Sequence, residues 1–451
     1  MINLSFHMAA APAKSAPIEQ IVTPWQATNS GGGFDYQKLI KQFGSTAIDG
    51  DLIRRIELAT NVPAHRFLRR GLFFSQRDIA QWLDSFEHGE EVYLYTGRGP
   101  TSEAMHLGHM VPIEFTKYLQ DAFDAILVVQ MSDDEKYYFK DDGHSIEHYQ
   151  RLGRENARDM IARGFRLNKT YIFSNAAEVA GEMQLNVVRM MRATTGNQIK
   201  GIFGLSTEDN NIGEIAWPIY QSVPAYSSSF PHLFGKRKVG CLVPMAIDQD
   251  PYFRLARDFV TTGPGRGLLK PAAIHSEFLT GLSGAGDKMS SSVTDAHLKS
   301  IFLSDKPAEI KSKITKYAFS GGGATLKEHQ ERGALLEVDV PFQYLLYFLE
   351  DDVELERIAT EYGQGRMKTS EIKAMMVNTV VSFVEDHQRN KALVTDAVVD
   401  AFFSKSREFD HGRTTRTALV PRPAAEYDKL GANFDRYFGQ AKPHLMSAPP
   451  V

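Results

Sequence analysis

Two short motifs, far apart in the chain, combine residue types that suit phosphate chemistry. Residues 106–109 read His-Leu-Gly-His, and residues 288–292 read Lys-Met-Ser-Ser-Ser. The first lies at the predicted start of a helix, where residues three apart share one face, so the rings of His106 and His109 point the same way. Gly108 lets a planar base or ribose approach the backbone, and the helix N-terminus attracts anions.

The second motif supplies a cation that can follow developing charge. When a carboxylate attacks the α-phosphate of ATP, negative charge builds on the departing pyrophosphate. Lys288 follows Gly281, Gly284 and Gly286 and precedes three serines, so it lies in a predicted loop of small residues. Each motif alone is more often an ordinary helix start or loop. Together they predict an enzyme that adenylates a carboxylate, with the two histidines and this lysine as catalytic residues.

The composition is typical of a globular protein with more than one domain. The 451 residues are 43% hydrophobic and 24% charged, and the formal net charge is -4. This length and composition predict two or three domains and a large core. Because the net charge is close to neutral, contact with a nucleic acid would depend on local basic patches.

Several classes of site and location are disfavoured. The single cysteine, Cys241, lies in an apolar run and is expected to be buried, which excludes disulfides and cysteine-bound zinc or iron–sulfur sites within one chain. Histidines and carboxylates show no metal-binding spacing, so no protein-held metal is predicted. The Ala/Pro/Ser-rich residues 1–20 indicate a disordered leader and not a signal peptide, and no stretch approaches a membrane span. A cytoplasmic protein without a membrane partner is expected.

The hydrophobic pattern predicts an α/β fold with a doubly wound, Rossmann-like parallel sheet. Candidate strands are residues 92–96, 125–131, 170–174, 241–247 and 273–279. Several are continuous apolar runs, as expected when helices cover both faces of a sheet. Before the first strand, helices are predicted at residues 34–43, 49–60 and 75–86, with Ser75 as the N-cap of the last.

The same pattern divides the chain into successive parts. They are a leader at 1–20, a mostly helical extension at 21–91, a catalytic domain at 92–339 with a largely helical insertion near 181–240, a helical domain at 340–409, and a tail at 410–451. The insertion is suited to pairing two subunits. Arg407, Arg413, Arg416 and Arg422 in or near the tail could contact RNA phosphate, but a solvated basic tail is the preferred interpretation.

Longer blocks around the two motifs closely resemble those of eukaryotic-type tryptophanyl-tRNA synthetases. The blocks are residues 95–100, 130–136 and 246–253, together with the Lys-Met-Ser loop. The similarity extends from about Thr23 to Lys405, and residues 246–253 form the most specific block. Residues 21–25 are also similar to the segment that folds over the active site in this family.

The resemblance implies a class I aminoacyl-tRNA synthetase with an all-α anticodon-binding domain. Such an enzyme uses ATP and Mg²⁺ to form tryptophanyl-adenylate, transfers the tryptophanyl group to tRNA(Trp), and works as a homodimer, with no DNA partner. The residues implied for tryptophan are Tyr95 and Gln130 at the indole N–H, Glu135, Gln221 and Gln249 at the ammonium, and Lys136 near the carboxylate. Those implied for ATP are Arg98, Gly99, His106, Gly108, His109, Lys288, Met289 and Ser290.

The chemistry of the indole agrees with this resemblance, although alternatives stay open. An indole has one donor and no acceptor, so a buried pocket must present oxygen, which Tyr95 and Gln130 can supply. A tyrosine in a strand is usually a packing residue, whereas a buried amide ending an apolar strand needs partners. A tyrosyl-tRNA synthetase shares the fold and both ATP motifs. A non-catalytic, synthetase-like RNA-binding protein is the other alternative, but it would be expected to lose His106, His109 or Lys288.

Overall fold

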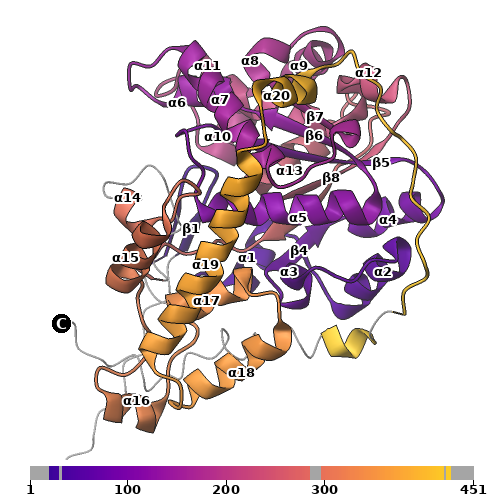
Figure 1. Cartoon of the computed structure of the whole chain (residues 1–451). Helices are drawn as coiled ribbons and strands as arrows, with labels where there is room; N and C mark the ends of the chain where they lie inside the picture. The colour runs from indigo at the N-terminus through magenta and orange to yellow at the C-terminus, as the bar shows by residue number, and fades with distance from the viewer. Residues whose placement is uncertain (1–19, 30–32, 285–295, 421–422, 428–451) are drawn as a thin grey trace, which may run out of the picture.

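A seven-stranded mixed sheet organises the protein (Figure 1). The computed structural model describes residues 20–29, 33–284, 296–420 and 423–427. The strands of the main sheet are β3 (Thr46–Ala47), β4 (Phe73–Arg77), β5 (Val92–Arg98), β6 (Ile126–Met131), β7 (Thr170–Ser174), β8 (Gly240–Ala246) and β9 (Ala272–Ser276). Their order is β3-β4-β9-β8-β5-β6-β7, and the five strands from β9 to β7 are parallel. The predicted doubly wound parallel fold is confirmed.

The order of the strands reverses at β5. From β5 the chain adds β6 and β7 on one side, and it later adds β8 and β9 on the other. Tyr93 therefore pairs with Ile126 of β6 and with Cys241 of β8. In open α/β sheets, ligands bind in the crevice beyond the carboxyl ends of the strands at such a reversal.

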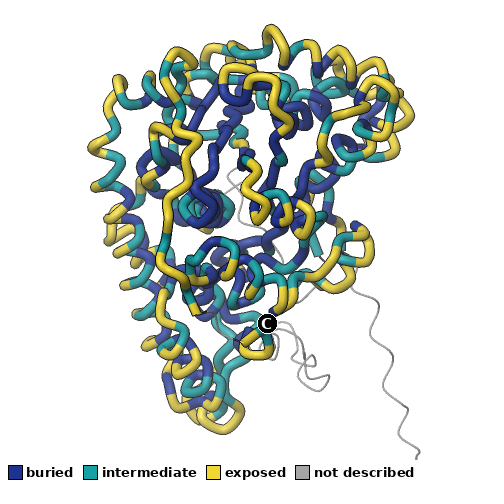
Figure 2. The backbone as a smooth tube through the Cα atoms, turned by 90° about the vertical axis from the view of Figure 1, so that its right-hand side faces the viewer, coloured by how far each residue is buried: buried dark blue, intermediate teal, exposed yellow. Residues whose placement is uncertain are grey.

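Alternate residues of the central strands enter two different cores. Leu94 and Leu127 belong to a hydrophobic cluster with helices of one face, whereas Tyr93, Tyr95 and Val128 belong to a second cluster with the insertion. Burial on both faces accounts for the continuous apolar strands in the sequence. Figure 2 shows these strands as buried segments inside a more exposed outer layer.

The described part of the chain before β5 contains strands that the sequence pattern did not predict, β4 among them. Its helices are α1 (Tyr36–Phe43), α2 (Gly50–Thr60), α3 (Arg66–Arg69) and α4 (Ile79–Glu87). The prediction of Ser75 as a helix N-cap is wrong, because Ser75 lies in β4, which pairs antiparallel with β9. The side chain of Gln76 instead accepts the Ile79 N–H at 3.1 Å. Pairing with a strand distant in sequence overrides the local helix signal here.

Helices fill the rest of the catalytic half. They are α5 (Leu107–Phe123), α6 (Asp133–Phe139), α7 (Ile146–Ile161), η1 (Leu167–Lys169), α8 (Asn175–Glu178), α9 (Gly181–Ala193), α10 (Gly196–Phe203), α11 (Ile212–Ser222), η2 (Val223–Ala225), η3 (Ser227–Ser229), α12 (Pro231–Phe234), η4 (Ile247–Gln249), α13 (Asp250–Phe259), α14 (Ala296–Lys299), α15 (Pro307–Tyr317) and α16 (Leu326–Arg332). Residues 181–240 are thus rich in helix, and in Figure 1 the insertion helices gather at the top.

Four helices of eight or more residues follow residue 339 within the described ranges. They are α17 (Val340–Phe348), α18 (Asp352–Gly363), α19 (Thr369–Lys391) and α20 (Asp396–Phe403). Buried residues at helical spacing on α19, including Ile372, Met376, Val380 and Val384, pack into the first core. None of the helices in the part of the chain that the structure describes is long and apolar enough to cross a membrane.

Residues 404–420 form an extended strap against the catalytic half, and not a solvated tail. In Figure 1 it descends along the right-hand side from α20 towards α2. Arg407 donates to the carbonyl oxygens of Leu167 and Thr170, and Arg413 donates to that of Phe86 at 2.8 Å. The prediction of a solvated basic tail is therefore wrong for the arginines that the structure describes. Arg422 lies outside the described residues.

Arg416 fastens this strap to the ends of two helices. Its guanidinium donates to the carbonyl oxygens of Asp121 and Ala122 in the last turn of α5, and to that of Thr60, the last residue of α2. The last carbonyls of a helix have no partner within the helix and lie at the negative end of its dipole. A cation at this position therefore satisfies two helix ends at once.

We expect Arg416→Ala to lower the free energy of unfolding by about 1.5–3 kcal/mol, because it removes charge-assisted hydrogen bonds to carbonyls that are left without a donor. Urea unfolding would measure the loss. Arg389→Ala is the matched control, since the Arg389 side chain is 68% exposed and pairs with Asp386, its neighbour one turn away on the same helix. This control should change stability by less than about 0.5 kcal/mol. Equal effects of the two substitutions would contradict the role of Arg416.

Candidate functional site

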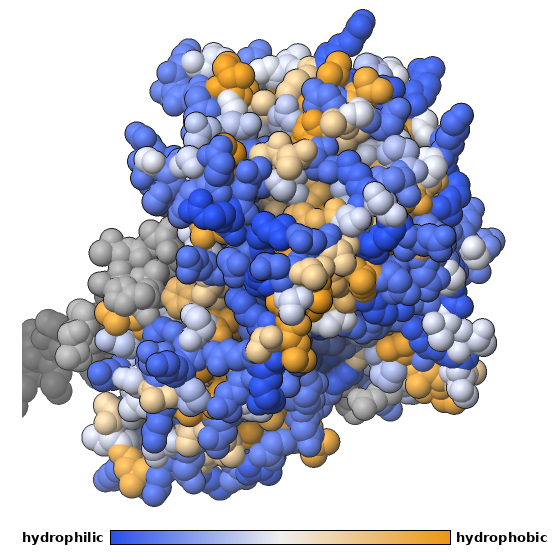
Figure 3. Space-filling model, turned by 45° about the horizontal axis from the view of Figure 1, so that its top comes forward, coloured by the Kyte–Doolittle hydropathy of each residue, from blue (hydrophilic) through white to orange (hydrophobic). Residues whose placement is uncertain are grey.

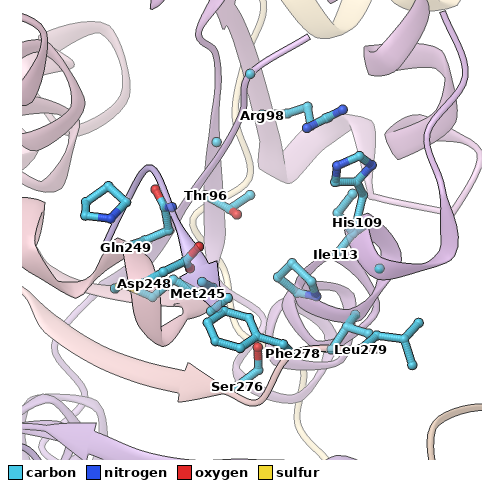
Figure 4. A pocket seen from close by; sticks show the side chains of 18 of the residues that line it. Thr96, Arg98, His109, Ile113, Met245, Asp248, Gln249, Ser276, Phe278 and Leu279 are labelled. Atoms are coloured by element: carbon cyan, nitrogen blue, oxygen red, sulfur yellow. The ribbon is translucent and has the colours of Figure 1, made fainter. Parts of the chain in front are cut away.

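A cavity of about 570 Å³ opens at the carboxyl ends of β5, β8 and β9, where the strand order reverses (Figure 4). Residues after each of these strands contribute to its wall, as does the start of α5. In Figure 4, Arg98 and His109 lie on one side and Asp248 and Gln249 on the other. The parallel sheet therefore gathers side chains from distant sequence positions into one pocket.

The two histidines of the first motif meet at the N-terminus of α5. His106 precedes the helix in an extended conformation, with φ -103° and ψ 166°, and its backbone N–H donates to Nδ1 of His109 at 3.3 Å. The rings stack with centroids 3.5 Å apart and an angle of 20°. Because Nδ1 of His109 accepts this bond, a neutral ring carries its proton on Nε2. Gly108 also lines the pocket.

The segment after the second motif is tied to the first. Leu107 donates its N–H to the carbonyl of Ile301 at 3.0 Å, and Leu303 donates to that of Met105 at 2.8 Å. Ser283 and Lys299, from either side of residues 285–295, line the pocket. The predicted Lys288, Met289 and Ser290 lie outside the described residues.

Arg98 ends β5 and adds a cation to the pocket. Its Nε donates to Oδ1 of Asn156 at 3.1 Å, and Nδ2 of Asn156 donates to the carbonyl of Ser102 at 2.8 Å. Burial lowers the pKa of Arg98 to about 10, so the guanidinium stays charged at neutral pH. None of the described groups accepts a hydrogen bond from its buried Nη2. This spare donor suits an anionic ligand.

A carboxylate and an ammonium lie side by side in the first turns of α6. Nζ of Lys136 donates to Oε1 of Glu135 at 2.6 Å, and the hydroxyl of Ser132 donates to Oε2 at 2.9 Å. Gly99 faces this pair closely, since a Cβ atom there would lie 2.6 Å from both Oε2 of Glu135 and Cε of Lys136. The glycine therefore leaves room for two charged groups of the pocket.

Tyr95 and Gln130 form a buried polar pair at the base of the site. The Tyr95 hydroxyl lies 2.7 Å from Oε1 of Gln130 and 2.9 Å from the carbonyl oxygen of Gln221. Burial raises the pKa of Tyr95 well above its usual value, so its hydroxyl keeps its proton. Tyr95 and Gln221 line the pocket, whereas Gln130 is fully buried behind Tyr95.

The opposite wall is held by a buried ion pair. Arg77 donates to both oxygens of Asp250, at 2.6 and 2.8 Å, and Nε2 of His275 lies 3.1 Å from Oδ1 of the same carboxylate. Burial opposes the charge of Asp250, but hydrogen bonds from His275 and Arg77 outweigh burial and hold its pKa below the usual range. The cluster joins β4, β9 and α13, and so fixes the pocket residues Gln249 and Ser276 beside it.

A short hairpin covers the pocket. Strands β1 (Gln20–Val22) and β2 (Ala27–Asn29) pair antiparallel, and the pocket-lining residues include Pro24–Thr28. Trp25 packs on Phe139 with ring centroids 4.5 Å apart, and its Nε1 donates to the carbonyl of Phe203 at 3.0 Å. The N-terminal segment therefore lies over the site.

The structure brings most of the predicted site residues to one cavity. These are Tyr95, Arg98, Gly99, His106, Gly108, His109, Glu135, Lys136, Gln221 and Gln249. Sequence reasoning did not select the lining residues Thr96, Asp248, Ser276, Glu277, Phe278 and Lys299. Several of these follow the carboxyl ends of β8 and β9, and that position was the available signal.

Known proteins of one family are similar to this chain in sequence and in fold. A family model described as tRNA synthetases class I (W and Y) matches residues 87–385. The chain is 49% identical to a cytoplasmic tryptophan–tRNA ligase of Arabidopsis thaliana, over 86% of this chain and 94% of that protein. It is 47% identical to the human cytoplasmic counterpart, over 86% and 81%. The crystal structure of Plasmodium falciparum tryptophanyl-tRNA synthetase superposes with a TM-score of 0.77 at 43% identity, covering 82% of this chain and 98% of that one.

We expect Asp250→Asn to lower the free energy of unfolding by roughly 3–5 kcal/mol, because Arg77 would stay buried without its carboxylate. Urea unfolding would measure the change. Asp258→Asn, at an exposed position of the same helix, is the control and should change stability by less than about 0.5 kcal/mol. A similar small effect at both positions would show that the buried pair does not hold this wall.

Proposed function

Because the chain belongs to the class I tRNA synthetases for tryptophan and tyrosine, we infer that it is a tryptophan–tRNA ligase. It activates tryptophan with ATP to tryptophanyl-adenylate, releasing pyrophosphate, and transfers the tryptophanyl group to tRNA, releasing AMP. Its relatives named above are cytoplasmic, and this enzyme is assigned to the cytoplasm as well. The alternative of a tyrosyl-tRNA synthetase is not favoured.

The observation that carries the choice of tryptophan is the oxygen-rich base of the pocket. In the described part of the chain, the Tyr95 hydroxyl donates to the side-chain oxygen of Gln130 and to the backbone oxygen of Gln221, so three oxygens gather around one hydroxyl hydrogen. These oxygens can accept further hydrogen bonds, and an indole has one N–H donor and no acceptor. A tyrosine substrate would bring a hydroxyl oxygen that also needs a donor, and its smaller ring would leave space.

The charged pair on α6 suits the α-amino and α-carboxylate groups of the amino acid. In the proposal, Glu135, Gln221 and Gln249 bind the ammonium, and Lys136 lies near the carboxylate. The existing Glu135–Lys136 contact at 2.6 Å supports this, because a zwitterion can exchange partners with such a pair without leaving a charge unpaired. Gly99 preserves the space in which that exchange takes place.

The hydrogen-bond donors around the start of α5 suit ATP. A carboxylate oxygen of tryptophan attacks the α-phosphorus, the bond to the bridging oxygen breaks, and the pyrophosphate takes the electron pair. His106, His109 and Arg98 face the position of the phosphates, and preorganised donors of this kind lower the barrier where charge develops. Lys288, with Met289 and Ser290, is proposed to complete the group around the leaving pyrophosphate. Gly108 allows the nucleotide to approach α5.

Magnesium is proposed to accompany ATP. The ion prefers oxygen ligands and keeps several waters, so phosphate oxygens supply much of its shell. The carboxylates of Asp248 and Glu277 also line the pocket, and their oxygen donors fit such an ion. When bound, the ion neutralises phosphate charge.

An ATP–pyrophosphate exchange assay tests this function. We expect tryptophan to support exchange, and tyrosine to do so with a kcat/KM lower by roughly two powers of ten or more, because the tyrosine hydroxyl oxygen would be left unpaired. Excess EDTA should abolish exchange and added Mg²⁺ should restore it. A preference for tyrosine, or no exchange with any amino acid, would contradict the proposal.

We also propose that the enzyme is a homodimer paired through the insertion, with α17–α20 serving the tRNA anticodon. Leu185, Val188 and Met191 follow one another at helical spacing on α9, with exposures of 45%, 52% and 37%. Figure 3, which brings the top of the molecule forward, shows apolar patches among hydrophilic residues there. Exposed apolar side chains on one helix face are suited to a self-complementary contact.

We expect Val188→Glu to shift the protein from dimer to monomer in analytical ultracentrifugation, because it places a charge at the centre of an apolar contact. Val353→Glu on α18 is the matched control, since Val353 is 78% exposed and lies on another part of the chain. The control should remain a dimer. A wild-type monomer would contradict the proposed homodimer, and a dimer that tolerates Val188→Glu would place the contact elsewhere.

A further inference from the structure

The amide of Gln130 is held in one orientation by acceptors on its nitrogen side. Its Nε2 donates to Oδ1 of Asn175 at 2.8 Å and to the backbone carbonyl of Tyr220 at 3.2 Å. A backbone carbonyl can only accept, so the NH₂ end must face Tyr220. The oxygen end is therefore turned towards Tyr95 and the base of the pocket.

The orientation of Asn175 is fixed in the same way, one step further from the pocket. Its Nδ2 donates to Oδ2 of Asp134 at 2.6 Å, so its own oxygen faces Gln130. Asn175 is fully buried at the start of α8, and Asp134 is 6% exposed on α6. Oδ1 of Asp134 accepts the Glu135 N–H at 3.0 Å. Hydrogen bonds thus connect Asp134, Asn175, Gln130 and Tyr95 in one directed series.

We propose that Asn175 and Asp134 are positioning residues for amino-acid selection, which fix the Gln130 amide so that its oxygen and not its NH₂ group faces the Tyr95 hydroxyl at the base of the indole pocket. This inference rests on the proposed tryptophan–tRNA ligase function. Neither residue lines the pocket, and Gln130 lies behind Tyr95, so each acts through Gln130 and the Tyr95 hydroxyl. Each amide in the series has its donor end turned towards Asp134 and its acceptor end turned towards the substrate.

The location of the series explains why it can set selectivity. Burial raises the pKa of Asp134 to about 7, although the hydrogen bond from Asn175 opposes this shift. Asp134 and the residues it contacts are therefore shielded from water. In such surroundings a donor facing a donor is costly, because water cannot replace the missing acceptor. If Asn175 is removed, the Gln130 amide loses one of the two acceptors that hold its nitrogen. Rotamers that turn the NH₂ group towards Tyr95, where it would compete with the indole N–H for the hydroxyl oxygen, then become accessible.

Asn175→Ala tests the proposal in the full-length enzyme, with tryptophan-dependent ATP–pyrophosphate exchange as the assay. We expect kcat/KM for tryptophan to fall about ten- to a hundredfold, the size of effect expected when a buried donor loses its acceptor. For benzothienylalanine, which has sulfur in place of the ring N–H, we expect a fall of about threefold or less, since this ligand has no donor to leave unpaired. The ratio of the two falls is the decisive quantity.

A double-mutant cycle separates action through Gln130 from a general effect. Gln130→Ala should itself lower the preference for tryptophan over benzothienylalanine. If Asn175 acts only by orienting Gln130, adding Asn175→Ala to Gln130→Ala should change the preference little further. Independent, additive losses of preference would overturn the proposal.

Asn186→Ala is the matched control. Asn186 is also fully buried, and its Nδ2 donates to the hydroxyls of Ser228 and Ser229, each at 2.9 Å, without joining the series. This variant should leave the preference for tryptophan over the sulfur analogue unchanged. Equal falls for both ligands in Asn175→Ala would show that Asn175 is a packing residue only.

Asp134→Asn provides a second variant of nearly the same shape, in case Asn175→Ala does not fold. An asparagine at position 134 can present a donor to Asn175, so it removes the constraint at the start of the series. It should lower the preference for tryptophan in the same direction as Asn175→Ala, and an unchanged preference would contradict the proposal. A wild-type enzyme without tryptophan-dependent exchange would instead overturn the proposed function itself.

Discussion

The parallel pairing of β5 with β6 on one side and β8 on the other is the constraint on which the pocket depends. Each strand delivers its carboxyl end to the same edge, so residues from three distant segments meet there. Tyr95, Arg98 and Gly99 come from β5 and the turn after it, Gln130 from β6, and Gln249 from the segment after β8. A register shift of one residue would turn Tyr95 to the opposite face of the sheet.

Most of the buried charged groups around the pocket are paired with a protein group. A few others keep a hydrogen-bonding atom that a ligand can use. Asp250 is bound by Arg77 and His275, and this ion pair stabilises the fold. Arg98 is held by Asn156 at one nitrogen and has a buried nitrogen that no described group binds. The same contrast applies to hydrogen bonds, because Asn175 is engaged on both ends of its amide whereas the oxygens around Tyr95 exceed the donors among them.

The sequence predicted an element correctly where neighbouring residues alone determine that element. The apolar strand runs were recognisable because burial on both faces requires them, and the helix start after His106 followed from the residue types around it. Ser75 shows the opposite case, since its apparent capping role is replaced by pairing of β4 with β9, a strand far away in the chain. Arg416 is similar, because a basic residue in a polar tail gives no sign of the two helix ends that it binds.

The sequence by itself determined the α/β class, the positions of the five parallel strands and the residue types of the candidate site. These features depend on hydrophobic periodicity and on short motifs, which involve residues close together in the chain. The tertiary structure alone decided that Gln130 lies behind Tyr95, that Asn175 and Asp134 orient its amide, and that residues 404–420 bind the catalytic half. These features depend on directed hydrogen bonds between groups distant in sequence. The direction of such a bond is set by which atoms face one another, and that is a property of the folded chain.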